Sequence, residues 1–370
     1  MDIRDRRLKA RLFKWGTCSV ETKRGLVKPR KVIMLKRFLS YYKPQMGLFV
    51  ADTVCALVLA AIDLAFPIIL RNLTGGLFTQ GQAVIMQALG MIAVGLVLIY
   101  AVRCACRYFV SYWGHVMGAR MESKMREDLF DQYERFSFAY FDRNSSGDMM
   151  SRVVNDLFDI CEAAHHVPEW IIICGIEIIG SFVILFTIAP VLALAMAVVT
   201  AAFAVIMFWQ NMRMREVFSD NRKKISGINA QLQDSLAGMR VVKSFANEET
   251  ERSKFRASNN RYLSSKENMY HAMGVYTATY GLLSGVLYVI VVLLGGWLVA
   301  QGQLQAVDMA TFALYISLFC TPLETLVNSA EMYQKAIAGF KRMDEVLSTA
   351  PDIQDKPDAA DLQVTAGAVE

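Results

Sequence analysis

Lysine and arginine are almost missing from three long windows of this chain. Only Arg71 interrupts the window from Pro44 to Val102, and neither residue type occurs at 153–212 or 267–334. A transmembrane helix needs about twenty apolar residues, so each window, about sixty residues or more, has room for two spans and a short turn. With 54% hydrophobic residues the chain is too apolar for a soluble enzyme, whereas 20% charged residues are too many for a chain wholly inside lipid.

Further absences concern secretion, disulfides and metals. The N-terminal segment lacks the apolar core of a cleavable signal peptide, so we expect none. None of the seven cysteines falls in a predicted outer turn, and a disulfide framework is not expected. Cys104 and Cys106 lie two apart on a helix and point to different faces. We predict no metal site, because the histidines are scattered over the cytoplasmic ends of helices: His115, His165, His166 and His271.

What is present is basic charge at the margins of the three windows. Lys and Arg crowd before, between and after them, which by the positive-inside rule places both termini and both long intervening segments in the cytoplasm. The sequence thus predicts an all-α, multi-pass protein of the plasma membrane with six long helices. The predicted spans are residues 47–70, 84–103, 167–188, 192–209, 272–299 and 307–330, with intracellular loops at 104–166 and 210–271.

The flanking segments differ from the membrane domain, which we predict at residues 34–348. Residues 1–33 are rich in Arg and Lys and form either a basic amphipathic helix on anionic lipid headgroups or a disordered basic tail. Residues 349–370 read as a polar linker.

The middle of the chain predicts an exposed helical hairpin. The helical pattern of the second span continues through Met121, Met125, Leu129 and Tyr133, which carries it roughly 35 to 40 Å beyond the lipid. An aromatic cluster follows, made by Phe138, Tyr140 and Phe141, and then a turn in which Ser145, Ser146 or Asp148 caps a new helix. An aromatic cluster exposed at such a tip needs a partner to cover it.

Two tips of this kind carry recognisable motifs. The first reads Tyr140-Phe141-Asp142, Gly147-Asp148-Met149, Ser151-Arg152 and Asn155-Asp156, and the second, expected at Gln231 to Arg240, contains Asp234-Ser235-Leu236-Ala237-Gly238-Met239-Arg240. With Pro322-Leu323 and Arg342-Met343, they make residues 34–348 resemble the transmembrane domain of ATP-binding-cassette (ABC) exporters of the type IV, six-helix class. Asp234 stands where the family commonly has Glu, and Gly339 where it has Ser.

The resemblance implies roles for both tips. In such exporters each tip is a coupling helix seated in a nucleotide-binding domain, so the implied coupling residues are Phe138, Tyr140, Phe141, Asp142, Gly147, Leu232, Asp234, Leu236 and Gly238. A second transmembrane domain, forming a homodimer or a heterodimer, and nucleotide-binding domains carrying ATP and Mg are the implied partners, with no nucleic acid. The chain has no Gly-x-x-x-x-Gly-Lys-Ser/Thr phosphate loop, so we expect no ATPase site and no catalytic residue in it.

Two function classes remain open at this stage. The first is the membrane half of an ATP-driven exporter of a hydrophobic compound, lipid, drug or peptide, with residues 349–370 leading to a nucleotide-binding domain outside this sequence. The second is a motor-less six-helix membrane protein, such as a channel-like subunit or a regulator, derived from the same domain. The cargo and the choice between homodimer and heterodimer are left open.

Several polar or special residues lie inside the predicted spans. Acidic groups there usually face a cavity or a partner helix, so Asp63, Glu177 and Glu324 are substrate-pathway candidates, either as an acidic lining that favours cationic or zwitterionic amphiphiles or as packing residues. Arg103 and Arg107 either touch lipid phosphates or line the inner cavity. Arg152 and Asp156 either pair along one helix face or contact the motor. Helix kinks are expected at Pro67 and Pro322, and close helix packing at Gly281 and Gly285.

Overall fold

The computed structural model describes residues 30–354, which divide into a short unit at 30–40 and a main unit at 41–354. The short unit is the helix α2 (Arg30–Ser40), closed by a hydrogen bond from the Ser40 hydroxyl to the Arg37 carbonyl at 2.6 Å. The predictions for the basic extension before residue 30 and for the linker after residue 354 lie outside the described residues.

All regular structure in residues 41–354 is helical. The first four spans lie in α3 (Met46–Gly75), α4 (Gln82–Phe109), α8 (Leu157–Ile188) and α9 (Pro190–Ala237). The fifth lies in α11 (Glu248–Ile290), which continues through the π-turn η5 (Val291–Gly295) into α12 (Gly296–Ala300), and the sixth in α13 (Ala306–Leu347). Six helical stretches in this part of the chain are long and apolar enough to cross a membrane, which confirms the predicted all-α membrane fold.

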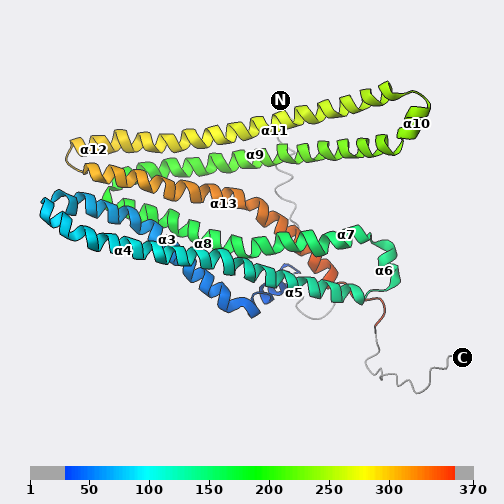
Figure 1. Ribbon diagram of the computed structural model, residues 1–370, viewed down its shortest axis with the longest axis horizontal. Helices are drawn as coiled ribbons and strands as arrows, with labels where there is room; N and C mark the ends of the chain where they lie inside the picture. The colour runs from blue at the N-terminus through cyan, green and yellow to red at the C-terminus, as the bar shows by residue number, and fades with distance from the viewer. Residues whose placement is uncertain (1–29, 355–370) are drawn as a thin grey trace, which may run out of the picture. The chain divides into compact units, whose positions relative to one another are not determined.

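The segments between the spans form two helical hairpins (Figure 1). The first hairpin descends through the π-turn η3 (Val110–Gly114) and α5 (His115–Glu134), turns through α6 (Phe138–Arg143) and α7 (Ser146–Ser151), and returns by the π-turn η4 (Arg152–Asp156). The second hairpin is the lower part of α9, the short helix α10 (Met239–Ser244) and the lower part of α11. Short 3₁₀ turns, η1 (Lys43–Gln45) and η2 (Leu77–Thr79), flank α3.

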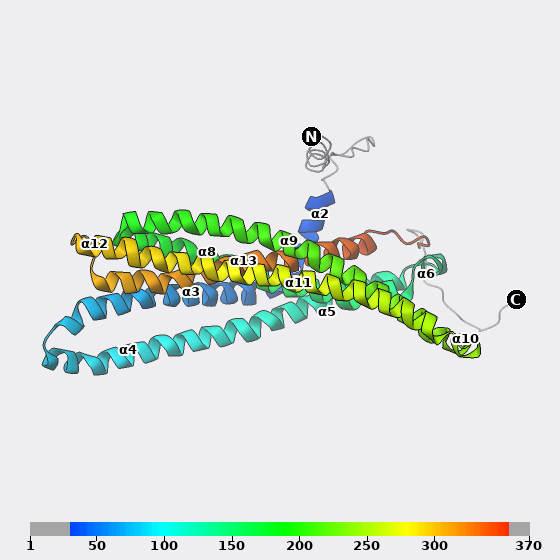
Figure 2. The same ribbon diagram turned by 90° about the horizontal axis from the view of Figure 1, so that it is seen from above.

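Two pairs of helices carry most of the packing within the main unit. α8 packs along α13 and also against α3, whereas α9 packs along α11 (Figures 1 and 2). The largest buried side chains gather where α13 meets α8 and α9, among them Phe312, Tyr315 and Phe319. The Tyr315 hydroxyl donates to the Leu64 carbonyl at 2.6 Å, which satisfies the one polar atom of that buried ring.

Arg71, the single basic residue of the first window, is neutralised by an acidic partner where α3 meets the start of α13. The Arg71 guanidinium lies 2.5 Å from a carboxylate oxygen of Asp308 at the start of α13. Asp308 also accepts from the Gln305 backbone amide at 3.0 Å and so caps α13. Arg71 is therefore part of a neutral pair that ties α3 to α13, and not a signal that this end faces the cytoplasm.

The turns between spans follow the sequence closely. Ala189 alone separates α8 from α9, and Pro190 occupies the first position of α9, where its missing amide is tolerated. At the turn before α13, Gly302 has φ of +72°, a conformation that favours glycine. Both turns were expected from the sequence.

The second hairpin tip begins later than predicted. The sequence placed it at Gln231 to Arg240, but α9 runs unbroken to Ala237 and the transverse helix α10 starts at Met239. The segment Gln231–Ala237 holds no glycine or proline, so nothing in it stops the helix before Gly238. The Gly238 amide donates to the Asp234 carbonyl at 2.9 Å and closes α9 there.

Candidate functional site

Both hairpin tips lie at one end of the main unit, opposite the turns that join the spans (Figure 1). α6 and α10 both lie at this end, on separate hairpins, and α12 lies at the other. The apolar spans separate the two ends. Since apolar helices of this length cross a bilayer, the tips stand on one side of the membrane, well clear of the lipid.

The aromatic cluster of the first tip divides into an exposed part and an anchored part. Phe138 is 90% exposed and Phe141 42% exposed. Tyr140 instead stacks on Phe136 with ring centroids 4.0 Å apart. Phe138 is therefore the side chain that α6 presents outward, while Tyr140 fixes α6 to the end of α5.

The turn after α6 is built by two side-chain hydrogen bonds. The Asn144 amide donates to the Tyr140 carbonyl at 2.8 Å and closes α6. Ser145 is the N-cap of α7, because its hydroxyl accepts from the Gly147 amide at 3.2 Å. Among the three capping residues that the sequence allowed, the structure thus selects Ser145. Asp142 and Gly147 are exposed beside this turn.

A partly buried ion pair links the first hairpin to α13. The Arg342 guanidinium donates to the two carboxylate oxygens of Asp156 at 2.6 and 2.5 Å. The intrahelical alternative, a pair with Arg152, is wrong, because the π-turn η4 changes the register of this segment and Asp156 faces α13. The hydrogen bonds to Asp156 raise the pKa of Arg342 above its ordinary value.

Close backbone approach accompanies this ion pair. A Cβ atom at Gly339 would lie 3.2 Å from the Asp156 carbonyl oxygen and 3.4 Å from the Ile160 side chain. Such contacts are tighter than a relaxed Cβ normally makes. The glycine at position 339, which the sequence comparison with the exporters marked as a departure, thus lets α13 sit directly on η4.

The chain leaves α13 beside the first tip. The Gln132 side-chain amide donates to the Thr349 carbonyl at 2.8 Å, and the Ser137 hydroxyl donates to a carboxylate oxygen of Asp352 at 3.0 Å. These contacts hold the segment that follows α13 against the end of α5. The described part of the chain therefore ends close to α6.

The second tip presents apolar side chains from the end of α9 and from the loop after α10. Leu232 is 37% and Leu236 67% exposed, while Asp234 is exposed on the same final turns of α9. Phe245, which follows α10, is 78% exposed. The sequence analysis did not choose Phe245 as a site residue, although a large aromatic residue next to a short polar helix is the same signal as Phe138.

Polar contacts within the second hairpin hold this tip together. A carboxylate oxygen of Glu251 accepts from the Ser235 hydroxyl at 2.5 Å and from the Gln231 side chain at 3.2 Å. The Ser235 hydrogen bond lowers the pKa of the Glu251 carboxyl below its ordinary value. Lys243 and Glu248 form a further ion pair at 3.2 Å.

A polar network that the sequence analysis missed joins the two helix pairs. The Asn211 side chain, 4% exposed, donates to the Asn328 side-chain oxygen at 3.1 Å and accepts from the Arg215 guanidinium at 2.6 Å. The Arg215 guanidinium also donates to the Val327 carbonyl at 3.3 Å. The available signal was an asparagine just below an apolar span on each of two helices, α9 and α13.

The acidic residues of the spans fall into two places. The Arg103 guanidinium donates to Asp63 at 2.9 and 3.3 Å, a pairing that the sequence analysis did not foresee, and whether Arg103 lines the cavity stays a prediction. Glu177 lies within electrostatic reach of Asp63, Arg103 and Arg107. Glu324 belongs elsewhere, near Tyr276 and Tyr280. The part these acids play in a substrate pathway stays a prediction.

The prolines and glycines of the spans behave differently. Pro67 and Pro322 lie buried inside α3 and α13, and the kinks expected there remain predictions. Within the described residues, no neighbouring atom lies within 4 Å of a Cβ built at Gly281 or Gly285. The expected close helix packing at these glycines is therefore not made inside this chain, because this face of α11 points away from the other helices.

Three of the four histidines lie together, which corrects the description of them as scattered. His115 on α5 meets His165 and His166 on α8, and their ligand nitrogens lie within 4.8 Å of one another. No local pattern indicates this meeting, because fifty or so residues and a complete hairpin separate His115 from the other two.

Comparison with known proteins agrees with this architecture. A family model described as "ABC transporter transmembrane region" matches residues 49–323. The chain is 33% identical over 329 residues to the uncharacterized ABC transporter ATP-binding protein YwjA of Bacillus subtilis (strain 168), an alignment that covers 89% of this chain and 57% of that relative.

Two more distant relatives have names that mention cargo. The ATP-dependent lipid A-core flippase of Syntrophus aciditrophicus (strain SB) is 23% identical over 90% of this chain and 55% of its own length. The putative multidrug export ATP-binding/permease protein YgaD of Bacillus subtilis (strain 168) is 22% identical over 91% of this chain and 59% of its own length. The chain thus spans a little over half the length of these relatives.

Proposed function

The chain belongs to the family of ABC transporter transmembrane regions, and we propose that it forms the membrane half of an ATP-driven exporter. The observation that carries this proposal is the pair of tips on one side of the membrane, each with a large apolar side chain in water. Phe138 is 90% exposed at the first tip and Leu236 67% exposed at the second. Exposed apolar groups on two neighbouring tips mark a surface that another protein covers.

The covering partners, in this proposal, are ATP-binding cassettes. The exposed faces of α6 and α10 dock on them, and ATP and Mg are held by the cassettes and not by this chain. The long helices above the tips continue without a flexible joint into the spans. Movement of a cassette is therefore transmitted to the spans as a rigid-body movement, which switches the substrate pathway between the two sides of the membrane.

The exposed apolar face of the second hairpin supports a second transmembrane domain as a partner. α9 and α11 pack along each other but touch α13 over a small area, and their outer faces expose Val205, Trp209, Leu282 and Leu293. Gly281 on this outer face leaves a flat surface that allows close helix approach. We assign this face to a second copy of the chain or to a close relative, so that two domains enclose one pathway.

An amphipathic compound is the cargo that this pathway suits. One relative is named as a lipid A-core flippase and another as a putative multidrug export protein. The Arg103–Asp63 pair, with Glu177 and Arg107 near it, supplies both signs of charge inside the spans. Such a group favours a headgroup that carries both charges, or a polar headgroup, over a simple cation.

The test is the ATPase activity of the assembled transporter. The cassette is identified by a phosphate-loop motif in the gene beyond residue 370 or in a neighbouring gene, and the complex is placed in lipid nanodiscs. Phe138→Ala and Leu236→Ala are expected to lower ATP turnover and its stimulation by lipid at least fivefold.

Phe130→Ala and Leu263→Ala, which change exposed residues on α5 and α11 away from the tips, are the controls. Equal activity of all four variants would refute coupling through these tips, and the lack of any cassette would favour the motor-less alternative.

A separate experiment tests the orientation. Single cysteines at Ser146 in the first tip and at Gln303 in the turn before α13 are introduced into a variant without native cysteines. A membrane-impermeant thiol reagent is expected to label position 303 in intact cells and position 146 only after permeabilisation. Labelling of position 146 from outside would overturn both the orientation and the proposed coupling.

A further inference from the structure

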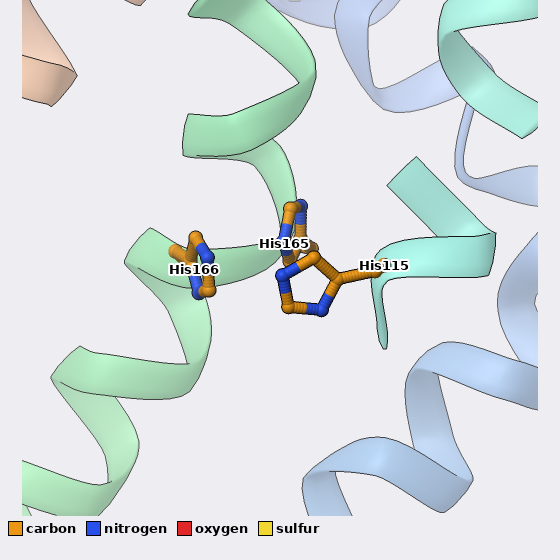
Figure 3. Close-up of side chains that lie close together, drawn as sticks. All are labelled: His115, His165 and His166. Atoms are coloured by element: carbon orange, nitrogen blue, oxygen red, sulfur yellow. The ribbon is translucent and has the colours of Figure 1, made fainter. Parts of the chain in front are cut away.

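A cluster of three imidazoles lies where the first hairpin leaves the apolar region (Figure 3). His165 is the nearest neighbour of both others, with ring centroids 4.6 Å from His115 and 4.1 Å from His166. His115 and His166 are 5.1 Å apart. Two helices supply these rings, so the cluster exists only because α5 packs against α8.

His165 has the protonation pattern of a metal ligand. Its Nδ1 lies 2.8 Å from the Cys161 carbonyl oxygen, which accepts a hydrogen bond and therefore places the proton on Nδ1. Nε2 is left with a free lone pair, is buried, and has no hydrogen-bond partner among the described residues, in a side chain that is 3% exposed. Metal-bound histidines are typically held in this way, with the second nitrogen donating to a carbonyl.

His166 adds a second unsatisfied nitrogen. Its Nδ1 is buried and makes no hydrogen bond within the described part of the chain. A buried ring nitrogen without a hydrogen bond costs free energy of folding. A metal ion that accepts both lone pairs would remove this cost.

Carboxylates around the cluster supply negative charge for a cation. Oxygens of Glu162 and Glu169 each lie 3.7 Å from a nitrogen of His166. Asp52 on α3 is buried, one of its oxygens has no partner among the described residues, and it lies within electrostatic reach of Glu169 and His166. These acids come from two helices and face the imidazoles from two sides.

Glycine makes room for the central ring. A Cβ atom at Gly118 of α5 would lie 2.8 Å from Nδ1 of His165, a distance that real Cβ atoms do not show. Any larger residue at this position would force the His165 ring away from the Cys161 carbonyl. The cluster therefore depends on the packing of α5 against α8 at Gly118 as well as on the histidines.

We propose that His115, His165 and His166 bind one divalent transition-metal ion, zinc in particular, which cross-links α5 to α8. Imidazole nitrogens favour zinc and its neighbours over calcium and magnesium, which take oxygen ligands. Zinc–nitrogen bonds of about 2.0–2.1 Å bring tetrahedral ligands to about 3.4 Å from one another, a contraction of roughly an ångström that rotation of the exposed His115 side chain provides. A water molecule completes the four ligands.

The position of the site gives the ion a mechanical consequence. The two arms of the first hairpin run from this cluster to the exposed tip, α5 over 20 residues. A cross-link between the two arms, at their ends far from the tip, makes the hairpin move as one rigid unit. Bound metal therefore stiffens the first hairpin and leaves the second hairpin, which contains none of the three ligands, unchanged.

Metal binding is measured on the whole chain in nanodiscs, purified with a tag that lacks histidine and stripped with a chelator. Zinc is titrated in competition with a chromogenic chelator, and cobalt is added separately to record its visible spectrum. We expect one ion per chain and the intense absorption of tetrahedral cobalt. His115→Ala, whose side chain is exposed and does not support the fold, is expected to weaken zinc binding at least tenfold, and His115→Ala combined with His166→Ala to abolish stoichiometric binding.

His271→Ala removes the remaining histidine, on α11, and is the matched control, with unchanged affinity expected. Hydrogen exchange measured with and without zinc supplies an independent readout. Zinc is expected to slow exchange at 115–134 and 157–166 but not at 248–270. Zinc affinity that is the same in the double variant and the wild type, or the weak spectrum of octahedral cobalt, would overturn the site. Exchange that is unchanged by zinc at 115–134 and 157–166 would overturn the cross-link.

Discussion

The two helical hairpins are built alike but held differently. The first is fastened to α13 by the Arg342–Asp156 pair, by the close approach at Gly339 and by the contacts of Thr349 and Asp352. The second is held mainly by contacts between its own arms, such as Ser235 with Glu251 and Lys243 with Glu248. Below the Asn211–Asn328 hydrogen bond, α9 and α11 have little support from the rest of the chain.

This difference shows which hairpin depends on a partner. The first hairpin is joined to α13 by the Arg342–Asp156 pair and by the close approach at Gly339, so in the proposed mechanism a force applied at α6 would reach the sixth span within one chain. The second hairpin has an exposed apolar face. Its polar contacts with α13 involve Asn328, the Val327 carbonyl and the exposed Arg222–Glu331 pair at 3.8 Å. A second transmembrane domain, as proposed above, would cover the exposed face.

The largest expected effect comes from breaking the ion pair that holds the first hairpin. Arg342→Ala leaves Asp156, whose side chain is 9% exposed, as a buried charge without its partner. We expect a loss of about 2–4 kcal/mol, near the lower part of the range for buried pairs because the guanidinium is half-exposed. Thermal unfolding in one detergent measures the loss.

Lys243→Ala is the matched control on the second hairpin. Its side chain is 68% exposed and its partner Glu248 39% exposed, so removal of this pair is expected to cost less than about 1 kcal/mol. A loss as large as that of Arg342→Ala would show that the two hairpins are held alike.

A second prediction concerns the connection between the second hairpin and α13. Asn211→Ala removes partners of Asn328 and Arg215 and is expected to cost about 1–3 kcal/mol, because buried polar atoms lose hydrogen bonds. Hydrogen exchange should rise in residues 212–237 more than in α8. Asn259→Ala, an exposed asparagine on α11, is the control and should change stability by less than about 0.5 kcal/mol. A rise confined to α8 would contradict the assignment.

A third prediction compares two glycines. Gly339→Ala places a methyl group 3.2 Å from the Asp156 carbonyl and is expected to cost about 1–2 kcal/mol in thermal unfolding. Gly285→Ala meets nothing in this chain and should leave the stability of the isolated chain unchanged. If α11 packs on a second domain, Gly285→Ala will instead weaken the dimer, which light scattering in detergent detects. Destabilisation of the monomer by Gly285→Ala would disprove the comparison.

The smallest effect is a pH dependence at the second tip. The pKa of Glu251 is lowered below its ordinary value of 4.5, first by the Ser235 hydroxyl and then by Lys254. A carboxyl with a lowered pKa stabilises the fold above its ordinary pKa, and this contribution is lost as the pH falls through the lowered value. Ser235→Ala should move the pKa of Glu251 upward. Carbon-13 NMR of labelled glutamate, assigned with Glu251→Gln, measures it, and an unchanged pKa would remove Ser235 as the cause.

The sequence predicted the six spans and the first tip well because both follow from local patterns. Long apolar stretches without Lys or Arg give the spans, and the cluster from Phe138 to Phe141 stands out inside a polar segment. The second tip was placed too early, since Gln231–Ala237 has no helix breaker to reveal where α9 ends. Its motif residues Leu232 and Asp234 lie on α9 and not on α10.

Pairings across the chain were the part that sequence reasoning missed. Arg103 binds Asp63, a partner that was not predicted, and Asp156, for which a pair with Arg152 was one of two alternatives, binds Arg342. The partners lie far apart in the sequence, so no local pattern connects them. The same reason hid the meeting of His115 with His165 and His166.

By itself the sequence determined which segments lie in lipid, because the free-energy cost of burying charge in a membrane depends on the residues of each segment alone. Only the tertiary structure decided which helices touch, and therefore which charges are neutralised, which histidines meet and which hairpin stands unsupported. Those contacts depend on the rotation of each helix and on turns such as η3 and η4, whose effect on distant side chains appears only when the helices are packed.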